Sequence, residues 1–426
     1  MKAIFIILLG LIFSPCIYAQ VDTNLTKHEL VKKQSNEIFD SLVKIRRDLH
    51  MHPEVSGGEQ RTSKFVEQYL LALGLEVKTN IGGYGVVGIL KGDKKGRKIA
   101  WRADMDAIKT DFPDKMDFKS ENEGVRHICG HDIHTTIGLG IANILANQKE
   151  DLEGTVYFIF QPSEENFLGA KAMIDDGLFD MIKPDEIYGL HAAPLPSGVI
   201  MTKPNEVYAY ARRIRVKFKN EAELDNLKQL MGTIARGLFR AAPNSKPWEV
   251  QNVVDPKIGL ASPETIYRDY LIINEDFHIH EDSNHILFDN NLFETDITNL
   301  DSIPIKIKQQ ILLSEYKNQL VSVEYVEENP TVLNNSELTA VAIETITAIY
   351  GVKSVAPDYG QIPYFNDDFA YFQQKIPGVY FFLGASDYAK GLISMPHSPD
   401  FAADEESIKY GVQYFSSLIL ERVNIE

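Results

Sequence analysis

One short segment of the chain combines three imidazoles, a thiol and a carboxylate: His127-Ile128-Cys129-Gly130-His131-Asp132-Ile133-His134. Thiolates and imidazoles are the ligands that suit zinc and the neighbouring transition metals. Cys129 and His131 stand two positions apart, just ahead of a helical pattern at Thr135–Leu145, so both side chains can point into one pocket. The alternative is a set of polar residues that only caps this helix, but the density of metal-type ligands favours a metal site.

Two consecutive glutamates form a second group of interest. Glu164 and Glu165 follow the apolar run Thr155–Phe160, which is typical of a strand covered on both faces. Adjacent carboxylates repel each other, so a pair beside a core strand needs a cation or a proton nearby. Hydrolysis by a metal-activated water needs one carboxylate as a ligand and another to accept a proton. A glutamate pair alone is more often a solvated surface feature, so its meaning here depends on the cysteine–histidine segment.

These groups follow apolar runs that alternate with helical patterns along the chain. Such alternation predicts an α/β fold with a mainly parallel sheet and helices on both faces. In open α/β sheets, ligands bind outside the carboxyl ends of the strands. The expected strands and the polar residues beyond them are Ile99–Arg102 with Asp104 and Asp106, Thr155–Phe160 with Glu164 and Glu165, Ile187–Leu190 with His191, and Val379–Leu383 before His397. Residues far apart in the chain are therefore expected to converge on one edge of the sheet.

Length and charge narrow the class of protein. The chain has 426 residues, which favours two domains over one hydrophobic core. Its formal net charge is −17, and it has no long basic run. Nucleic-acid binding needs clustered lysines and arginines, so no nucleic-acid partner is expected.

The first nineteen residues are expected to be a signal peptide. Lys2 precedes the apolar run Ala3–Phe13, and Ala19 is a small residue suited to cleavage before Gln20. The run is shorter than the roughly 20 residues that span a bilayer, so no transmembrane segment is expected in the mature chain. Export to the periplasm or the extracellular space is therefore expected. A lipoprotein attached through Cys16 is the less favoured reading, because Pro15 stands where a small residue is usual.

Further short motifs stand in a fixed order along the chain. They are Arg46-Arg47-Asp48-Leu49-His50 with Pro53-Glu54, Trp101-Arg102-Ala103-Asp104-Met105-Asp106-Ala107, Cys129 to His134, Phe160 to Glu165, Gly189-Leu190-His191, Asp368 to Phe372 with Pro377-Gly378, and His397. With these motifs the chain resembles the aminoacylase/carboxypeptidase-type metallohydrolases of peptidase family M20. The resemblance is strongest to the amidohydrolases that include hippurate hydrolases, indole-acetyl-amino-acid hydrolases and N-acetyldiaminopimelate deacetylases.

The resemblance implies a metal-dependent hydrolase of the amide bond in N-acyl amino acids, short peptides or similar small amides. It implies two divalent metal ions, Zn, Mn, Co or Ni, bound by Cys129, His131, Glu165, His191 and His397, with Cys129 between the two ions. Glu164 would be the general base and acid that acts on a metal-activated water. Asp104 would hold a ligand in orientation. A third reading, in which Cys129 is a redox or nucleophilic thiol, finds little support in the chain.

The resemblance also implies a smaller α+β lid domain inserted into the catalytic domain. The expected division is a signal peptide at 1–19, a first catalytic part at 20–210, the lid at 211–326 and a second catalytic part at 327–426. Within and after the lid we expect a strand at Arg212–Phe218, a helix at Glu221–Arg240, a returning strand at Asn291–Ile297 and a helix at Ser336–Tyr350. Relatives often dimerise through this domain, so a homodimer is an open expectation.

One departure from the family pattern bears on activity. Family members usually carry a Gly-Gly-His-x-Ala-x-Pro-His loop after the first lid strand, and its histidine is thought to bind the carbonyl oxygen. Here Lys219-Asn220 leads straight into Glu221, and that loop is missing. Asn284, His278 or His280 are candidate substitutes, with solvated surface histidines as the alternative. A catalytically impaired homologue that binds a small carboxylate or peptide therefore stands beside the active hydrolase as a second hypothesis.

Overall fold

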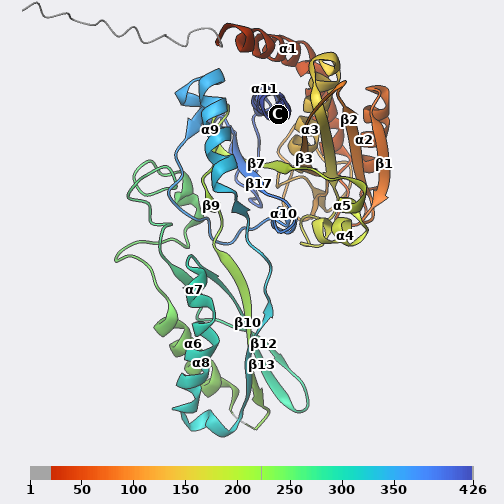
Figure 1. The fold of residues 1–426 in the computed structure, drawn as a ribbon. Coiled ribbons are helices and arrows are strands. Elements are labelled where there is room, and N and C mark those ends of the chain that lie inside the picture. Colours follow the sequence, from red (N-terminus) through yellow and green to blue (C-terminus); the bar gives the residue numbers. More distant parts are fainter. Residues whose placement is uncertain (1–20, 222, 425–426) are drawn as a thin grey trace, which may run out of the picture.

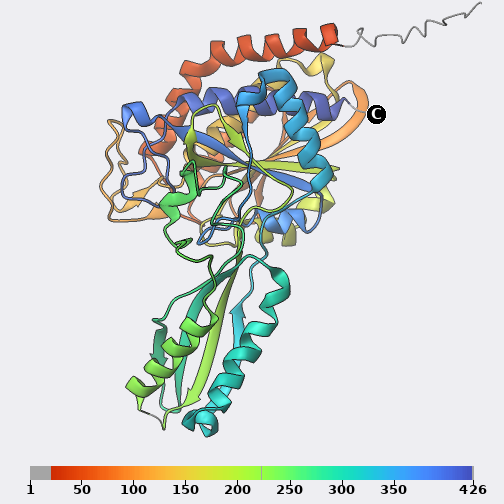
Figure 2. The same cartoon turned by 90° about the vertical axis from the view of Figure 1, so that its left-hand side faces the viewer.

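The computed structural model describes residues 21–221 and 223–424, and the expected signal peptide with Cys16 lies outside them. The chain forms a larger part around an eight-stranded sheet and a smaller, elongated part around a second sheet. The smaller part extends away from the larger one in both views (Figure 1 and Figure 2). No helix among the described residues is both long enough and apolar enough to cross a membrane.

The large sheet has the order β1-β2-β6-β3-β7-β17-β8-β16. Its strands are β1 (Glu76–Ile81), β2 (Gly85–Lys91), β3 (Lys94–Asp104), β6 (Glu153–Gln161), β7 (Glu186–Pro196), β8 (Ile200–Met201), β16 (Val355–Ala356) and β17 (Gly378–Ser386). The four central strands, β6, β3, β7 and β17, are parallel to one another, whereas β1 and β2 are added antiparallel at one edge. The predicted mainly parallel sheet is therefore confirmed.

Helices cover both faces of this sheet, which explains the apolar strand sequences. One face packs against α2 (Gln60–Ala72), α3 (His131–Ala146), α9 (Ser336–Tyr350) and α11 (Glu406–Val423), and α1 (Val21–Met51) packs on α3 and α11. The other face packs against α4 (Gly169–Asp175), α5 (Leu178–Met181) and α10 (Phe369–Gln373). Helix α3 packs closely against α11 at Gly140. Any side chain at this position would clash with α11, since a Cβ there would lie 2.5 Å from Cγ2 of Val412.

Strand β7 is longer than the sequence predicts. Its pairing with β3 ends at Gly189, but its pairing with β17 continues as far as Pro196. His191 was expected at the end of the strand and instead lies inside it, opposite Phe382 of β17. Beyond Gly189, β7 no longer pairs with β3. His191 therefore still lies at the edge of the sheet where the other parallel strands end.

The second sheet is antiparallel, with the order β11-β13-β10-β14 and β12 paired to β13. Its strands are β10 (Tyr210–Lys219), β11 (Leu271–Ile273), β12 (His278–Glu281), β13 (His285–Glu294) and β14 (Leu320–Glu327). Helices α6 (Leu224–Leu238) and α8 (Ser302–Leu312) contact each other and pack on this sheet (Figure 1). This is the smaller α+β lid domain that the resemblance implied.

The predicted returning strand at Asn291–Ile297 was placed too late in the chain. The strand is β13, where Ile286, Phe288 and Leu292 alternate into the core of the lid domain. Ile297 instead begins the short helix α7 (Ile297–Leu300), which Asp296 caps by accepting a hydrogen bond from the backbone N–H of Thr298. Asn290 and Asn291 interrupt the alternation of apolar and polar residues in this strand, so its first half was not predicted from the sequence.

A long segment between α6 and β11, residues 239–270, returns from the lid domain to the large part. We call it the return segment; it contains one short 3-10 helix, Val250–Val254. The backbone N–H of Tyr359 donates to Leu260 at 2.9 Å, and that of Gln361 donates to Tyr267 at 2.8 Å. Its residues Val253, Leu260 and Tyr267 are buried in the core on the α10 side of the large sheet.

The remaining strands are short pairs in the connections. They are β4 (Ile108–Lys109) with β5 (Val125–Arg126), and β9 (Asn205–Glu206) with β15 (Leu333–Asn334).

Candidate active site

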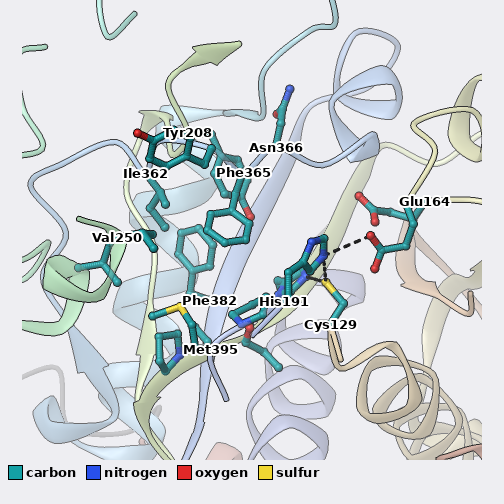
Figure 3. Close-up of a pocket in the computed structure, with 18 residues that line it drawn as sticks. Cys129, Glu164, His191, Tyr208, Val250, Ile362, Phe365, Asn366, Phe382 and Met395 are labelled. Carbon is teal, nitrogen blue, oxygen red and sulfur yellow. Dashed lines mark hydrogen bonds and ion pairs between the residues drawn. The ribbon is translucent and has the colours of Figure 1, made fainter. Parts of the chain in front are cut away.

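The thiol of Cys129 lies at the centre of a cluster of side chains from four separate stretches of chain. Its Sγ is 3.1 Å from Nε2 of His191 and 3.2 Å from Nε2 of His397. Nε2 of His397 is also 3.3 Å from Oε2 of Glu165 (Figure 3). Residues more than two hundred positions apart in the chain thus meet at the edge of the large sheet, as the sequence predicts.

His131 completes the cluster from the side of α3. Its Nε2 lies 3.7 Å from Oε1 of Glu165 and 3.7 Å from Oε2 of Glu164. Both Nε2 of His131 and Oε1 of Glu165 are buried and have no hydrogen-bond partner. Buried polar atoms without partners are costly, so these two atoms need a further group between them.

Five groups of donor atoms among the described residues could each hold a metal ion, and two of these groups consist only of the five predicted ligands. Cys129, His131 and His191 form one group, and Cys129, Glu165 and His397 form the other. Cys129 belongs to both. Sulfur, imidazole nitrogen and carboxylate oxygen together suit first-row transition metals. The residues therefore fit two divalent ions that share the thiol.

A glycine turn sets the positions of Cys129 and His131. Gly130 has φ +96°, in the left-handed region, and α3 begins at the next residue. A Cβ at Gly130 would lie 3.1 Å from the Cβ of Ala192, so a side chain here would be both strained and crowded. The start of α3 also directs the positive end of the helix dipole toward the carboxylates.

Asp106 and Asp104 hold the histidines of α3 in orientation. Nδ1 of His131 lies 2.9 Å from the backbone oxygen of Asp106 and donates there, which leaves Nε2 free as a ligand. Nε2 of His134 accepts from the backbone N–H of Ala192, so its Nδ1 donates to Oδ1 of Asp104 at 2.6 Å. Asp104 was predicted to orient a metal ligand; in the structure it accepts from His134, which is not a predicted ligand, and its Oδ2 lies 3.8 Å from Nε2 of His131.

A buried network of charges lies under Glu164. The guanidinium of Arg102 pairs with Asp104, Asp367 and Asp368, at 2.5, 2.9 and 3.1 Å. The sequence analysis did not assign roles to Asp106, His134, Arg102, Asp367 or Asp368. The signals were present, since each belongs to or directly adjoins a motif already noted there.

Burial and neighbouring charges act on the carboxyl group of Glu164. Glu164 is buried; burial, followed by the charges of Asp367, Glu165, Asp368 and Asp104, raises its pKa well above the usual value. A carboxyl group with a raised pKa can accept a proton and return it, as general acid–base catalysis requires.

The pKa values of the other donors show how strongly the cluster depends on charge. Burial, followed by the charges of Glu165 and Glu164, raises the pKa of the Cys129 thiol. Burial opposes protonation of His131, but the charge of Asp104 and the hydrogen bond to Asp106 raise its pKa to about 10. Positive charge is thus favoured at His131, whereas burial, followed by the charges of His134 and His131, lowers the pKa of His191.

A pocket of about 160 Å³ opens beside the cluster. Glu164, Cys129 and His191 line one side of it, and apolar side chains line the other (Figure 3). The apolar residues include Tyr208, Val250, Val253, Ile362, Phe365, Phe382 and Met395. A second hollow, lined by Arg212, Arg213 and Asn291 among others, shares Glu165 and Asn366 with the first.

The lid residues considered as substitutes for the missing loop do not line this pocket. His278 and His280 are exposed on β12, and Asn284 is in the turn between β12 and β13. The backbone N–H of Asn220 donates to the oxygen of Asn284, which places this turn at the far end of the lid domain (Figure 1). Within the described part of one chain, these residues therefore do not replace the lid histidine.

Comparisons with known proteins agree with this geometry. Residues 100–421 match peptidase family M20/M25/M40. Thermostable carboxypeptidase 1 of Saccharolobus solfataricus is 32% identical over 411 residues, covering 90% of this chain and 95% of that protein. IAA-amino acid hydrolase ILR1-like 4 of Arabidopsis thaliana is 27% identical over 406 residues, covering 91% and 87%.

A solved structure supports the same assignment. The Bacillus subtilis YXEP protein, a dinuclear metal binding peptidase from family M20, superposes with a TM-score of 0.73 and 26% identity. The likeness covers 92% of this chain and 99% of that one. The chain therefore belongs to peptidase family M20/M25/M40 and is an enzyme that acts on amide bonds.

Proposed function

We propose that the protein hydrolyses the amide bond of N-acyl amino acids, with Cys129, His131, Glu165, His191 and His397 as ligands of two divalent metal ions and Glu164 as general base and acid. One observation carries the proposal. The five ligand residues form two groups of three that share Cys129, and Oε2 of Glu164, which is in neither group, lies 3.7 Å from Nε2 of His131. Zn, Mn, Co and Ni all suit this mixture of sulfur, nitrogen and oxygen donors.

Two bound cations would supply positive charge that makes a water molecule more acidic and stabilises the charge developing on the amide carbonyl oxygen. Glu164 accepts the proton of the attacking water, because its buried carboxyl group has a raised pKa. Glu164 then donates that proton to the amide nitrogen as the C–N bond breaks, so that a neutral amine departs. Asp106 keeps the ring of His131 in place, and Asp104 does the same for His134.

The second hollow offers a place for the carboxylate of the amino acid. Arg212 lines it; its buried Nε has no hydrogen-bond partner and lies 3.8 Å from Oε2 of the exposed Glu328. Asn366 stands where the two hollows meet. Its Nδ2 donates to the backbone oxygen of Pro330, so its buried and unpaired Oδ1 is free to accept from the substrate amide N–H.

The catalytically impaired homologue is the second candidate, and the missing lid histidine favours it. Loss of one donor to the carbonyl oxygen costs on the order of 100-fold in rate, which slows a hydrolase without abolishing its activity. The test is release of free amine from a panel of N-acyl amino acids by metal-reconstituted protein and by Glu164→Gln. Release that depends on Glu164 supports the hydrolase, and equal background from both proteins rules it out.

Export and assembly are further parts of the proposal. Removal of residues 1–19 would give a mature chain that begins at Gln20, which mass spectrometry of protein from the producing cells would detect. A homodimer through the lid domain is supported by apolar side chains exposed on or beside α8: Ile305 at 56%, Leu312 at 47% and Leu313 at 83%. Sedimentation of the purified protein would measure the assembly directly.

A further inference from the structure

The turn that carries Glu164 has an unusual backbone. Residues 162–169, which we call the Glu164 turn, follow β6 directly, and the side chain of Glu164 points toward Cys129 and the histidines (Figure 3). Ser163 has φ +56° and Phe167 has φ +62°, both in the left-handed region that is unfavourable for residues with a side chain. Contacts from outside the turn are therefore expected to hold this shape.

Hydrogen bonds within the turn fix only its second half. The backbone N–H of Phe167 donates to the oxygen of Glu164 at 2.7 Å, and that of Gly169 donates to the oxygen of Ser163 at 3.0 Å. Neither bond uses the N–H of Ser163 or of Glu165, the two N–H groups on either side of Glu164. The direction in which the Glu164 side chain leaves the backbone thus depends on what binds those two groups.

A buried carboxylate binds the first of these N–H groups. The N–H of Ser163 donates to Oε1 of Glu59 at 2.7 Å, and the same oxygen accepts from the N–H of Gly57 at 3.0 Å. Glu59 lies between α1 and α2, is fully buried and stands more than a hundred positions before the turn in sequence. Burial of a carboxylate is unfavourable unless it accepts hydrogen bonds, so these contacts tie Glu59 and the turn to each other.

Asp106 binds the second N–H group. The N–H of Glu165 donates to Oδ2 of Asp106 at 3.0 Å, and the hydroxyl of Ser56 donates to the same oxygen at 2.7 Å. Asp106 also orients His131, a proposed metal ligand. Among the described residues, none of the side-chain hydrogen bonds of Glu59 reaches a proposed metal ligand. Of the two carboxylates, Glu59 is therefore the one whose contact bears on Glu164 alone.

The segment that carries Glu59 is fixed to the large sheet. Val55 pairs with Ala107 in a parallel bridge, and the N–H of Ala107 donates to the backbone oxygen of Glu54 at 2.8 Å. Ala107 directly follows Asp106, so the two carboxylates are anchored at the same place just beyond β3. Glu59 therefore offers the turn a fixed acceptor and does not move with it.

We propose that Glu59 is a positioning residue: by binding the N–H of Ser163 it keeps the turn in its left-handed conformation, so that Glu164 faces the substrate pocket while Glu165 stays among the metal ligands. This role rests on the proposed amide hydrolysis, in which Glu164 moves the proton. Misplacement of a reacting group by about 1 Å costs about 100-fold in rate, even when the substituted residue is far from the chemistry. Loss of the Glu59 contact is therefore expected to appear in kcat.

Substitution of Glu59 tests this role. Glu59→Leu removes the acceptor, and kcat of the metal-reconstituted full chain should fall by about 10- to 100-fold on the N-acyl amino acid that the wild type hydrolyses fastest. KM and metal content should stay near the wild-type values, because Asp106 still binds the N–H of Glu165. Glu59→Gln keeps a side-chain oxygen for the N–H of Ser163 and should retain most of the activity. An unchanged kcat in Glu59→Leu, or an equal fall in Glu59→Gln, overturns the proposal.

Glu54 provides the matched control. Its carboxylate lies in the same segment and accepts the backbone N–H groups of Arg61 and Thr62 at the start of α2, at 2.9 and 2.8 Å. Glu54→Leu should lower the unfolding free energy but leave kcat of the folded, metal-loaded protein unchanged, because the lost bonds belong to α2 and not to the turn. Equal falls of kcat in Glu54→Leu and Glu59→Leu contradict the proposal.

Two further variants separate positioning from stability. Glu59→Asp keeps the charge but shortens the side chain by one methylene, so it should lower kcat in the same direction even when Glu59→Leu does not fold. Glycine adopts left-handed φ values without steric cost, so Ser163→Gly should restore part of the kcat lost in Glu59→Asp or Glu59→Leu. Wild-type kcat in Glu59→Asp, or no recovery in the double variants, contradicts the proposal.

Hydrogen exchange resolved to single amides tests the contact without turnover. The amide of Ser163 should exchange at least about tenfold faster in Glu59→Leu than in the wild type, because it loses a buried acceptor. The amide of Glu165, which Asp106 binds, should keep its rate. Faster exchange at Ser163 in a protein that cleaves no amide would mean that the proposed hydrolysis fails and the control of the turn by Glu59 stands. Equal exchange at Ser163 in the two proteins overturns the positioning role.

Discussion

The edge of the large sheet and the return segment contribute to the same pocket in different ways. At the sheet edge, Cys129, His191 and His397 converge because parallel strands end together there. The return segment has only one short 3-10 helix, and backbone hydrogen bonds to residues 359–361 hold it in place. The sheet edge supplies reactive groups, and the return segment supplies an apolar surface.

This difference indicates that catalysis and substrate contact are carried by separate parts of the chain. Substitutions at the sheet edge should change metal content or turnover for every substrate. Substitutions that alter only the lining of the pocket or of the second hollow should leave metal content unchanged. The following predictions test that separation.

The largest effect is expected at Glu164. Glu164→Gln removes the proton acceptor but keeps nearly the same shape, so kcat should fall by about 10²- to 10⁴-fold for all substrates. Metal content should stay at the wild-type level, because Glu164 is not a proposed ligand. Metal loss in this variant would mean that Glu164 has been assigned the wrong role.

Removal of a buried charge near the sheet edge should lower stability. The guanidinium of Arg46 is fully buried and lies 2.8 Å from Asp132, the residue after His131. Arg46→Met leaves the buried Asp132 carboxylate with the His50 imidazole, at 2.9 Å, as its remaining ionisable partner and should lower the unfolding free energy by about 3 kcal/mol in denaturant titrations. Arg47→Met, in which the lost side chain was 47% exposed, is the control and should cost about 0–1 kcal/mol. Similar losses in the two variants would contradict this account.

A smaller effect is expected at the proposed carboxylate site. Arg212→Gln should raise KM for N-acyl amino acids by about tenfold and leave kcat nearly unchanged, because it removes one charge-assisted contact. Arg213 pairs with Glu327 at 3.0 Å, more closely than Arg212 pairs with Glu328 at 3.8 Å, so Arg213→Gln should change KM much less. Substrates whose carboxylate is replaced by an amide should not distinguish Arg212→Gln from the wild type. A fall in kcat without a change in KM would count against this role.

The smallest effect is a pH dependence of stability at His50. Burial alone would lower its pKa, but hydrogen bonds to Asp114 and Asp132 outweigh burial and raise the pKa above the usual 6.5. The protonated form therefore stabilises the fold below that pH, and this contribution is lost as pH rises through the raised pKa. The difference in unfolding free energy between wild type and His50→Asn should shrink with rising pH.

The sequence was informative where local pattern and chemistry coincide. The run Thr155–Phe160 predicted β6, and Glu164 and Glu165 follow it at the sheet edge. The helix predicted at Ser336–Tyr350 has those bounds in α9. Such features depend on residues close in sequence, and the parallel sheet then brings separate strand ends together.

The apolar side of the pocket could not be predicted in the same way. Val250 and Val253 belong to a segment without strand or helix periodicity, and their contacts with Tyr208 and Ile362 depend on tertiary structure alone. Asn366 likewise carries no motif, and its unpaired Oδ1 becomes visible only once Pro330 is placed beside it. Residues that are positioned by backbone hydrogen bonds to distant parts of the chain cannot be recognised from a local pattern in a single sequence.

The central claim is that one thiol joins two metal ions at the edge of the sheet. Elemental analysis of metal-reconstituted protein, wild type against Cys129→Ser, tests it most directly. We predict two divalent ions per wild-type chain and, because both sites lose a shared ligand, fewer than one per Cys129→Ser chain. Two ions retained by Cys129→Ser, or none bound by the wild type, would contradict the claim.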